Sequence, residues 1–212
     1  MDVSRQHTKG SAKAERGPKA RTRRLILDTA IRLMQQGITP SVSEAAEAAG
    51  VSRATAYRYF SSQAALVQAV VDEALGPILD WNSASSDVET RVADLLETSL
   101  PRIEAFEATF KAALKLSLDQ WAMRQAGTLG TEPPFTRGHR VGLLRDALAP
   151  LDTLSPDKFE RLARALSMVF GVEALVVLKD ICGLEGEEMR SVAEWAARAL
   201  IRAAISEETA NP

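Results

Sequence analysis

Two short helical patterns follow one another with almost no space between them in the stretch SVSEAAEAAGVSRATAYRYF. Ser41, with Glu44 three positions later, forms the capping-box pattern that starts a helix. Gly50 is the residue type typical of the position just after a helix end, and Ser52 can cap a second helix that starts at Arg53. Only two or three residues are left for the turn, so the pattern predicts a helix-turn-helix.

The second helix of this motif carries polar and basic side chains that its own packing does not use. Val42, Ala46 and Ala49 are spaced to face inward, and Val51 fills the turn. Hydrogen-bond donors on the outer face suit the phosphates and base edges of duplex DNA, whereas a merely solvated face usually mixes both charge signs. The side chains left on the outside are Arg53, Thr55, Tyr57, Arg58 and Tyr59.

A longer pattern surrounds the motif, from about residue 21 to residue 70. Its pieces are Arg23-Arg24-Leu25-Ile26-Leu27-Asp28-Thr29-Ala30, Gly37, Ser41-Val42, Ala49-Gly50-Val51-Ser52, Thr55-Ala56-Tyr57-Arg58-Tyr59-Phe60 and Leu66. With this spacing, the segment resembles the N-terminal domain of TetR-family transcriptional regulators. The chain departs from the family at Ala45, Ala54 and Gln63, where Ile, Gly and Lys are common. The remaining residues resemble the family only in length and helical pattern.

The resemblance implies an all-α fold. A three-helix helix-turn-helix DNA-binding domain would occupy residues 21–66, and a larger helical domain for effector binding and dimerisation would occupy residues 67–206. A disordered basic tail is expected at 1–20 and a short tail at 207–212. Arg53 is the candidate for reading guanine, and Thr55 and Tyr57 for phosphate or thymine-methyl contacts. By position, the DNA contacts would be Arg23, Ser43, Ser52, Arg53, Thr55, Tyr57, Arg58 and Tyr59.

Helical periodicity continues along the rest of the chain, and no strand alternation of useful length appears. The first helix is expected at residues 22–36, and a fourth from Ser61 or Ser62 to about Leu79. Further helices are expected at 87–100, 102–126, 137–150, 156–182 and 187–206, with Pro101 as one of the breaks. The apolar stretch at 174–178 is expected to be a buried helix.

The last two expected helices are apolar beyond a single face, so each needs a second surface to cover it. The resemblance implies that they pair with their counterparts in a homodimer, whereas an ordinary monomer core is the alternative. The candidate interface residues are Phe170, Ala174, Val177, Leu178, Val192, Ala196, Ala199, Leu200 and Ala203. On the last helix, Trp195 and Ile201 are expected to lie off a single apolar stripe that is formed by Met189, Val192, Ala193, Ala196, Ala199, Leu200 and Ala203.

The resemblance also places an apolar effector pocket among the middle helices. His139 would supply an orienting hydrogen bond, although a lone histidine is as compatible with a structural role, and the aromatic residues are as compatible with plain core. The candidate pocket residues are Phe106, Phe110, Leu114, Trp121, Met123, Phe135, His139 and Leu143.

Charge is unevenly distributed over the chain. Residues 1–60 hold 11 Lys and Arg against 5 Asp and Glu, while residues 61–212 hold 15 against 23. A basic head on an acidic body is expected when one end meets a polyanion. With two histidines and one cysteine, a His/Cys metal cluster and an intramolecular disulfide are excluded. We therefore expect no enzyme and no cofactor. The pattern lacks a signal peptide, so a cytoplasmic location is expected. No apolar run approaches the ~20 residues of a membrane span, so none is expected.

These patterns predict a homodimeric repressor that binds a palindromic operator and is released by a small apolar effector. Two alternatives stay open: a DNA binder or activator that needs no effector, and a helical dimer that mainly binds other proteins. The sequence does not specify the effector, the operator, the regulated genes, the sign of regulation or whether the N-terminal tail contacts DNA.

Overall fold

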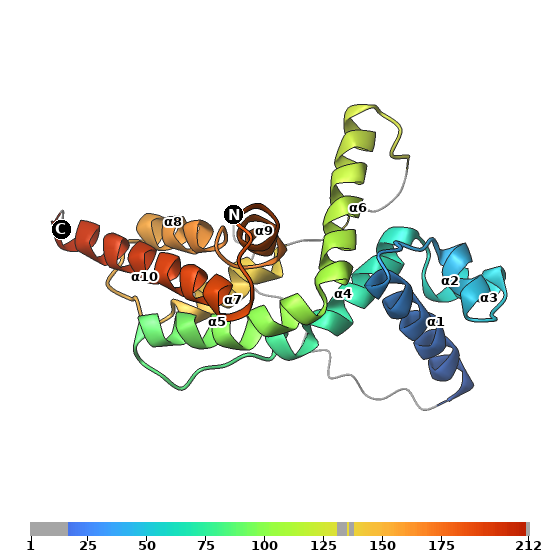
Figure 1. Ribbon diagram of the computed structural model, residues 1–212, viewed down its shortest axis with the longest axis horizontal. Helices are drawn as coiled ribbons and strands as arrows, with labels where there is room; N and C mark the ends of the chain where they lie inside the picture. The colour runs from blue at the N-terminus through green and yellow to red at the C-terminus, as the bar shows by residue number, and fades with distance from the viewer. Residues whose placement is uncertain (1–16, 131–134, 136–137, 211–212) are drawn as a thin grey trace.

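The computed structural model describes residues 17–130, 135 and 138–210, and every regular element within them is helical, which confirms the all-α prediction (Figure 1). The predicted basic tail falls almost wholly outside these residues. The molecule is elongated, with the N-terminal helices at one end and the C-terminal helices at the other. The helices are α1 Pro18–Gln35, α2 Val42–Ala48, α3 Arg53–Tyr59, α4 Gln63–Leu79, α5 Val88–Ala105, α6 Glu107–Gln125, α7 His139–Ala147, α8 Pro156–Leu166, α9 Val172–Leu175, the π-helix η1 Val176–Ile181 and α10 Gly186–Ala210.

The first three helices pack on one another around fully buried residues of α1, including Ile26, Ala30 and Met34. The predicted capping box is confirmed at the start of α2. The Ser41 N–H donates to Glu44 Oε2 at 2.7 Å, and the Glu44 N–H donates to Ser41 Oγ at 3.2 Å. The hydrogen bond from the Ser41 backbone stabilises the carboxylate and lowers the pKa of Glu44.

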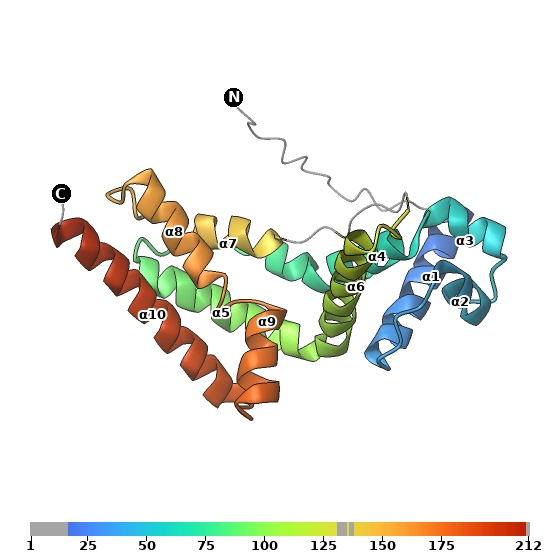
Figure 2. The same ribbon diagram turned by 90° about the horizontal axis from the view of Figure 1, so that it is seen from above.

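The helix α4 joins this head to the rest of the chain. Ser62 caps it by accepting from the Ala65 N–H at 3.1 Å, and its buried face includes Leu66, Val70 and Ile78. It contacts α1 on the head side and α5 and α6 on the body side (Figure 2). The expected domain boundary between residues 66 and 67 falls inside α4, so one continuous helix crosses between the two parts of the chain.

The C-terminal helix α10 packs against α5 and α8, and α7 lies against α5 and α8. The buried residues of α10 are Met189, Ala193, Ala197, Ile201 and Ala204. The structure divides the predicted stripe. Met189 and Ala193 face the core together with Ile201. Val192, Ala199 and Ala203 are exposed, as is Trp195, which was expected off the stripe. A spacing of mostly four residues keeps one face inward over the 25 residues of α10.

Three predicted helix boundaries need correction. The first helix starts at Pro18, not near residue 22, because proline suits the first helical position. Pro101 does not end a helix but lies inside α5. Proline has no N–H, so the carbonyl of Glu97, four residues earlier, loses its helical partner. Both residues are exposed, so solvent can bind that carbonyl. The single helix predicted at 156–182 is instead divided, with α8 ending at Leu166 and α9 starting after Gly171, which has a φ of 114°.

Candidate functional site

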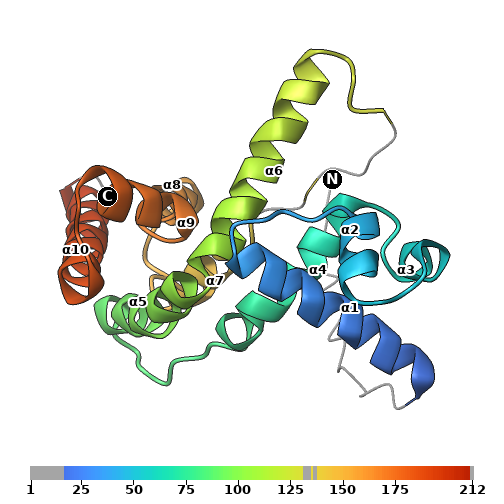
Figure 3. The ribbon, with the colours of Figure 1, turned by 45° about the vertical axis from the view of Figure 1, so that its right-hand side comes forward.

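The helix α3 lies at one end of the molecule (Figure 3), and its exposed side chains are mostly polar. Its residue Ala56 is fully buried and fixes which face packs inward. Arg53, Tyr57 and Arg58 are exposed, whereas Thr55 is half-buried. Tyr59 is also half-buried and packs against the core. The outer surface of α3 therefore offers two guanidinium groups and a phenol that can meet a polyanion.

Hydrogen bonds within the turn organise the beginning of α3. The Thr55 N–H donates to Ser52 Oγ at 3.3 Å, and the Ser52 hydroxyl donates to Thr55 Oγ1 at 2.9 Å. Ser43 Oγ lies 3.5 Å from the Tyr57 hydroxyl, so α2 also contributes to this surface. The structure thus brings Ser43, Ser52, Thr55 and Tyr57 together next to Arg53.

The arginines of α1 divide into two kinds. The Arg23 guanidinium lies over the ring of Phe60, 5.4 Å from its centroid, which places it beside the end of α3. Arg24 instead forms ion pairs with Asp28 and Glu73, each at 2.8 Å. The hydrogen bond to the Glu73 carboxylate, and to a smaller extent the one to Asp28, raises the pKa of Arg24. Phe60 itself is buried. Arg23 is therefore positioned at the polar surface, whereas Arg24 ties α1 to α4.

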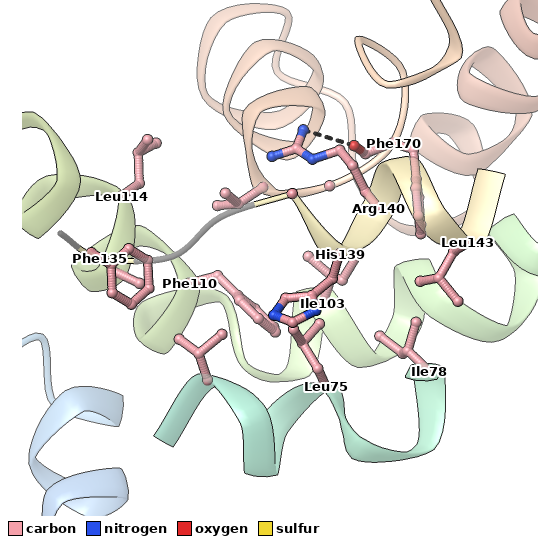
Figure 4. A pocket seen from close by; sticks show the side chains of 15 residues that line it. Leu75, Ile78, Ile103, Phe110, Leu114, Phe135, His139, Arg140, Leu143 and Phe170 are labelled. Carbon is pink, nitrogen blue, oxygen red and sulfur yellow. Dashed lines mark hydrogen bonds between the residues drawn. The ribbon is translucent and has the colours of Figure 1, made fainter. Parts of the chain in front are cut away.

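A mostly apolar cavity of about 100 Å³ lies in the body (Figure 4). Its walls come from α4, α5, α6, α7 and the turn between α8 and α9. The His139 imidazole points into it, near Leu75 and Ile103, and His139 Nε2 lies 4.0 Å from Asp72 Oδ1 on α4. The lining residues are Val71, Leu75, Ile78, Ile103, Phe110, Ala113, Leu114, Phe135, Gly138, His139, Arg140, Leu143, Phe170, Gly171 and Val172.

Five of the candidate pocket residues in the sequence lie at this cavity: Phe110, Leu114, Phe135, His139 and Leu143. Three others lie elsewhere. Phe106 packs under the Arg102 guanidinium, 4.9 Å from its ring centroid. Trp121 is 58% exposed and Met123 is 47% exposed, on the end of α6 that projects from the body.

Sequence reasoning missed the wall that α4 contributes and the turn at Gly171. The α4 residues Val71, Leu75 and Ile78 recur at helical spacing, and this second apolar face was the available signal. Arg140 was also missed, although it is adjacent to His139. The Phe-Gly pair at 170–171, inside an apolar run, was the signal for a break at the cavity.

Apolar side chains are also exposed on η1 and on α10. We call these residues together the C-terminal face and define it by Val177, Ile181, Val192, Trp195, Ala196, Ala199 and Ala203. Ile181 is 74% exposed and Trp195 is 72% exposed. The α10 members recur at intervals of three and four residues, so they share one side of that helix.

The candidate interface residues of the sequence divide between this face and the interior. Val177, Val192, Ala199 and Ala203 are exposed, whereas Leu178, Ala196 and Leu200 are half-buried. Phe170 and Ala174 are buried within the chain, and Phe170 lines the cavity. The stretch at 174–178 is therefore only partly the buried helix expected of it, because Val177 is 48% exposed.

An ion-pair network fixes η1 to α6. Glu107 Oε1 lies 2.6 Å from Lys111 Nζ and Glu107 Oε2 lies 2.7 Å from Lys179 Nζ, while Lys111 also contacts Asp180 at 2.7 Å. Hydrogen bonds from Lys111 and then Lys179 lower the pKa of Glu107. The base of the C-terminal face is thus held to the helix that lines the cavity.

Residues 17–130, 135 and 138–210 contain no group of three or more His, Cys, Asp and Glu side chains that can hold a metal ion. Within the same part of the chain, no helix has both the length and the apolar character required to cross a membrane.

The exposed α3, mounted on α2 through a tight turn within an all-helical chain, defines a helix-turn-helix protein. Residues 26–70 match the sequence profile of the bacterial regulatory proteins of the tetR family. Two relatives from strains of Mycobacterium tuberculosis, both described as uncharacterised HTH-type transcriptional regulators, are 32% identical over 137 residues. That match spans 62% of this chain and 62% of each relative.

Solved structures show the same fold. A TetR transcriptional regulator from Rhodococcus sp. RHA1 aligns over 87% of this chain and 97% of its own, with a TM-score of 0.56 and 18% identity. A TetR-family regulator from Mesorhizobium loti MAFF303099 aligns over 90% of this chain and 98% of its own, with a TM-score of 0.51 and 17% identity. Residues 26–70 thus carry the N-terminal domain of the tetR family of bacterial regulatory proteins, and the chain as a whole has the fold of these two solved regulators.

Proposed function

We propose that this protein is a homodimeric transcriptional repressor that binds an inverted-repeat DNA operator and is released from it by a small apolar effector. The observation that carries the proposal is the polar outer surface of α3 on a TetR-family helix-turn-helix. Arg53, Tyr57 and Arg58 are exposed there, so their polar groups are available to a partner. A DNA duplex is the partner whose groove and phosphates match such a helix.

In this proposal, α3 enters the major groove and divides its contacts between bases and backbone. Arg53 lies in the first turn of α3, where recognition helices contact base edges, and its guanidinium suits bidentate hydrogen bonding to guanine. Tyr57, whose hydroxyl lies 3.5 Å from Ser43 Oγ, and Arg23, whose guanidinium lies over Phe60, would contact phosphates. Phosphate contacts position the helix, whereas Arg53 reads sequence.

The C-terminal face supports the homodimer. A tryptophan and an isoleucine that are each more than two-thirds exposed are unusual on a solvated surface. A second copy of the same face would cover them, and the alanines along α10 permit close helix approach. A twofold dimer would hold two α3 helices in successive major grooves, about 34–36 Å apart.

The cavity supports regulation by a small molecule, because α4 forms one of its walls and also contacts α1 in the head. An effector that binds better to a second position of α4 would shift the chain toward head positions that no longer match the operator. The loss of DNA affinity would equal the difference in effector affinity between the two states. We assign residues 21–66 to DNA binding and 67–206 to effector binding and dimerisation.

Selection of bound sequences from a random duplex library tests the proposal. The intact chain at about 0.15 M salt is expected to enrich an inverted repeat, which it should then hold with a dissociation constant of about 10⁻⁸–10⁻¹¹ M. Recovery of unrelated sequences, all bound with an affinity that falls steeply as salt is added, would contradict sequence-specific recognition. Enrichment of a single half-site would contradict the dimer.

A further inference from the structure

The cavity has a marked chemical asymmetry. Thirteen of the side chains or glycines that line it are apolar, and the two with polar side chains, His139 and Arg140, are both basic and adjacent. They lie in the first turn of α7 (Figure 4). The acidic groups nearest to them are outside the lining: Asp72 beside His139 and Glu173 beside Arg140. Because the two polar side chains of the lining are both basic, the cavity suits an anionic group on an otherwise apolar ligand.

Arg140 holds the break between α8 and α9 together. Its Nη1 donates to the carbonyl oxygens of Ser167 at 3.1 Å and Phe170 at 3.0 Å, near the end of α8. Its Nη2 forms an ion pair with the Glu173 carboxylate in the first turn of α9. One guanidinium at the cavity wall thus binds the segment before the break through carbonyls and the segment after it through a carboxylate.

Gly171 is shaped to this guanidinium. A Cβ atom at that position would lie 2.9 Å from Arg140 Cζ and Nη1 and 3.3 Å from Nε, and the φ of +114° is one that other residues rarely adopt. The guanidinium therefore rests on bare backbone. The absence of a side chain at Gly171 therefore allows the Arg140 guanidinium to occupy this position beside the cavity.

We propose that the cavity binds a compact apolar acid whose carboxylate replaces Glu173 on Nη2 of Arg140. The inference rests on the proposed function and specifies its effector class. Because the carbonyl hydrogen bonds to Ser167 and Phe170 use Nη1, Arg140 can keep them while exchanging one carboxylate for another. The exchange removes the ion pair between Arg140 of α7 and Glu173 of α9 at the moment the ligand binds.

The size of the cavity restricts the apolar part of the ligand. A water molecule needs about 10–15 Å³ of such volume, so a cavity of about 100 Å³ accommodates roughly seven to ten water-sized groups. Short aliphatic acids and single-ring aromatic acids have that size. Phe110, Leu143 and Phe170 provide apolar walls for the ring or chain.

The consequence for regulation follows from what α9 carries. The helix continues directly into η1, which bears Val177 and Ile181 of the C-terminal face. The network of Glu107, Lys111 and Lys179 holds η1 to α6, and α6 contacts α1 in the head. Loss of the Glu173 ion pair would thus be transmitted to both the dimer surface and the head.

Calorimetric titration of the intact chain with matched acids and amides tests the inference. Benzoate is compared with benzamide, and hexanoate with hexanamide, so that only the charged group differs within each pair. Each acid is expected to bind about ten- to a hundredfold more tightly than its amide, as for hydrogen bonds to a charged group. Equal binding of acid and amide, or no binding of either acid, would overturn the proposal.

Variants of the ion pair test the exchange itself. Glu173→Gln removes the competing carboxylate and is expected to raise acid affinity about tenfold without changing amide affinity. Arg140→Met is expected to make acid and amide bind equally, and the gain in Glu173→Gln does not depend on that variant folding. Glu160→Gln is the matched control, since Glu160 pairs with Arg145 at 2.7 Å between α7 and α8 but does not line the cavity. Weaker acid binding in Glu173→Gln would contradict the exchange.

DNA retention separates this inference from the proposed function. Acid-driven loss of the inverted repeat supports both. Release by the amides as readily as by the acids would overturn the acid assignment and leave the effector-released repressor intact. Absence of any sequence-specific DNA binding, measured without ligand, would instead contradict the proposed function.

Discussion

Replacing Trp195 with glutamate is expected to convert the protein to a monomer and to lower its affinity for the inverted repeat by about a hundredfold or more. Trp195 is 72% exposed on α10 and lies within the C-terminal face. Buried aromatic residues at the centre of an interface often contribute the largest share of binding energy. A carboxylate there would be buried without a partner on each subunit. Sedimentation gives the mass, and a duplex titration gives the affinity.

Leu79→Glu is the matched control for this variant. Leu79 is a large apolar residue with 40% exposure, but it lies at the end of α4, outside the C-terminal face. The control is expected to remain dimeric and to bind the repeat as the parent chain does. A Trp195→Glu protein that stays dimeric with unchanged DNA affinity would show that α10 is not the dimer interface.

Replacing Arg53 and Tyr57 with alanine is expected to affect DNA binding in two different ways. Arg53→Ala should lower affinity for the selected repeat about ten- to a hundredfold and relax base preference at one position of each half-site. Tyr57→Ala should weaken binding to selected and unrelated duplexes by similar factors, because a backbone contact carries no sequence information. Titrations of both variants against both kinds of duplex distinguish the two roles.

Arg161→Ala controls for the loss of a positive charge alone. Arg161 lies on α8, and its side chain is 62% exposed and paired with Glu207. This variant is expected to bind both kinds of duplex nearly as the parent chain does. If Arg53→Ala changes neither affinity nor base preference, α3 does not read the groove.

Local signals predicted the head well because they act within a few residues. The capping box needs only Ser41 and Glu44, and Ser62 caps α4 through the Ala65 N–H. Such contacts are set by spacing along one helix, so the printed sequence contains them in full.

Packing between distant elements was harder to anticipate. Four-residue steps along α10 put Ile201 inside and Trp195 outside, and only the position of α5 and α8 decides which face is covered. The break at Gly171 depends on Arg140, 31 positions earlier in the chain, whose guanidinium fills the space of a Cβ atom. The α4 wall of the cavity likewise depends on how α6 and α7 approach it.

Half-site spacing provides the most direct test of a dimer that reads two major grooves. Inserting about five base pairs at the centre of the selected repeat leaves every base contact available but rotates one half-site by about half a helical turn. Affinity is expected to fall by about a hundredfold or more, toward that of a single half-site. Unchanged affinity for the lengthened repeat would contradict two α3 helices held in fixed register by one dimer.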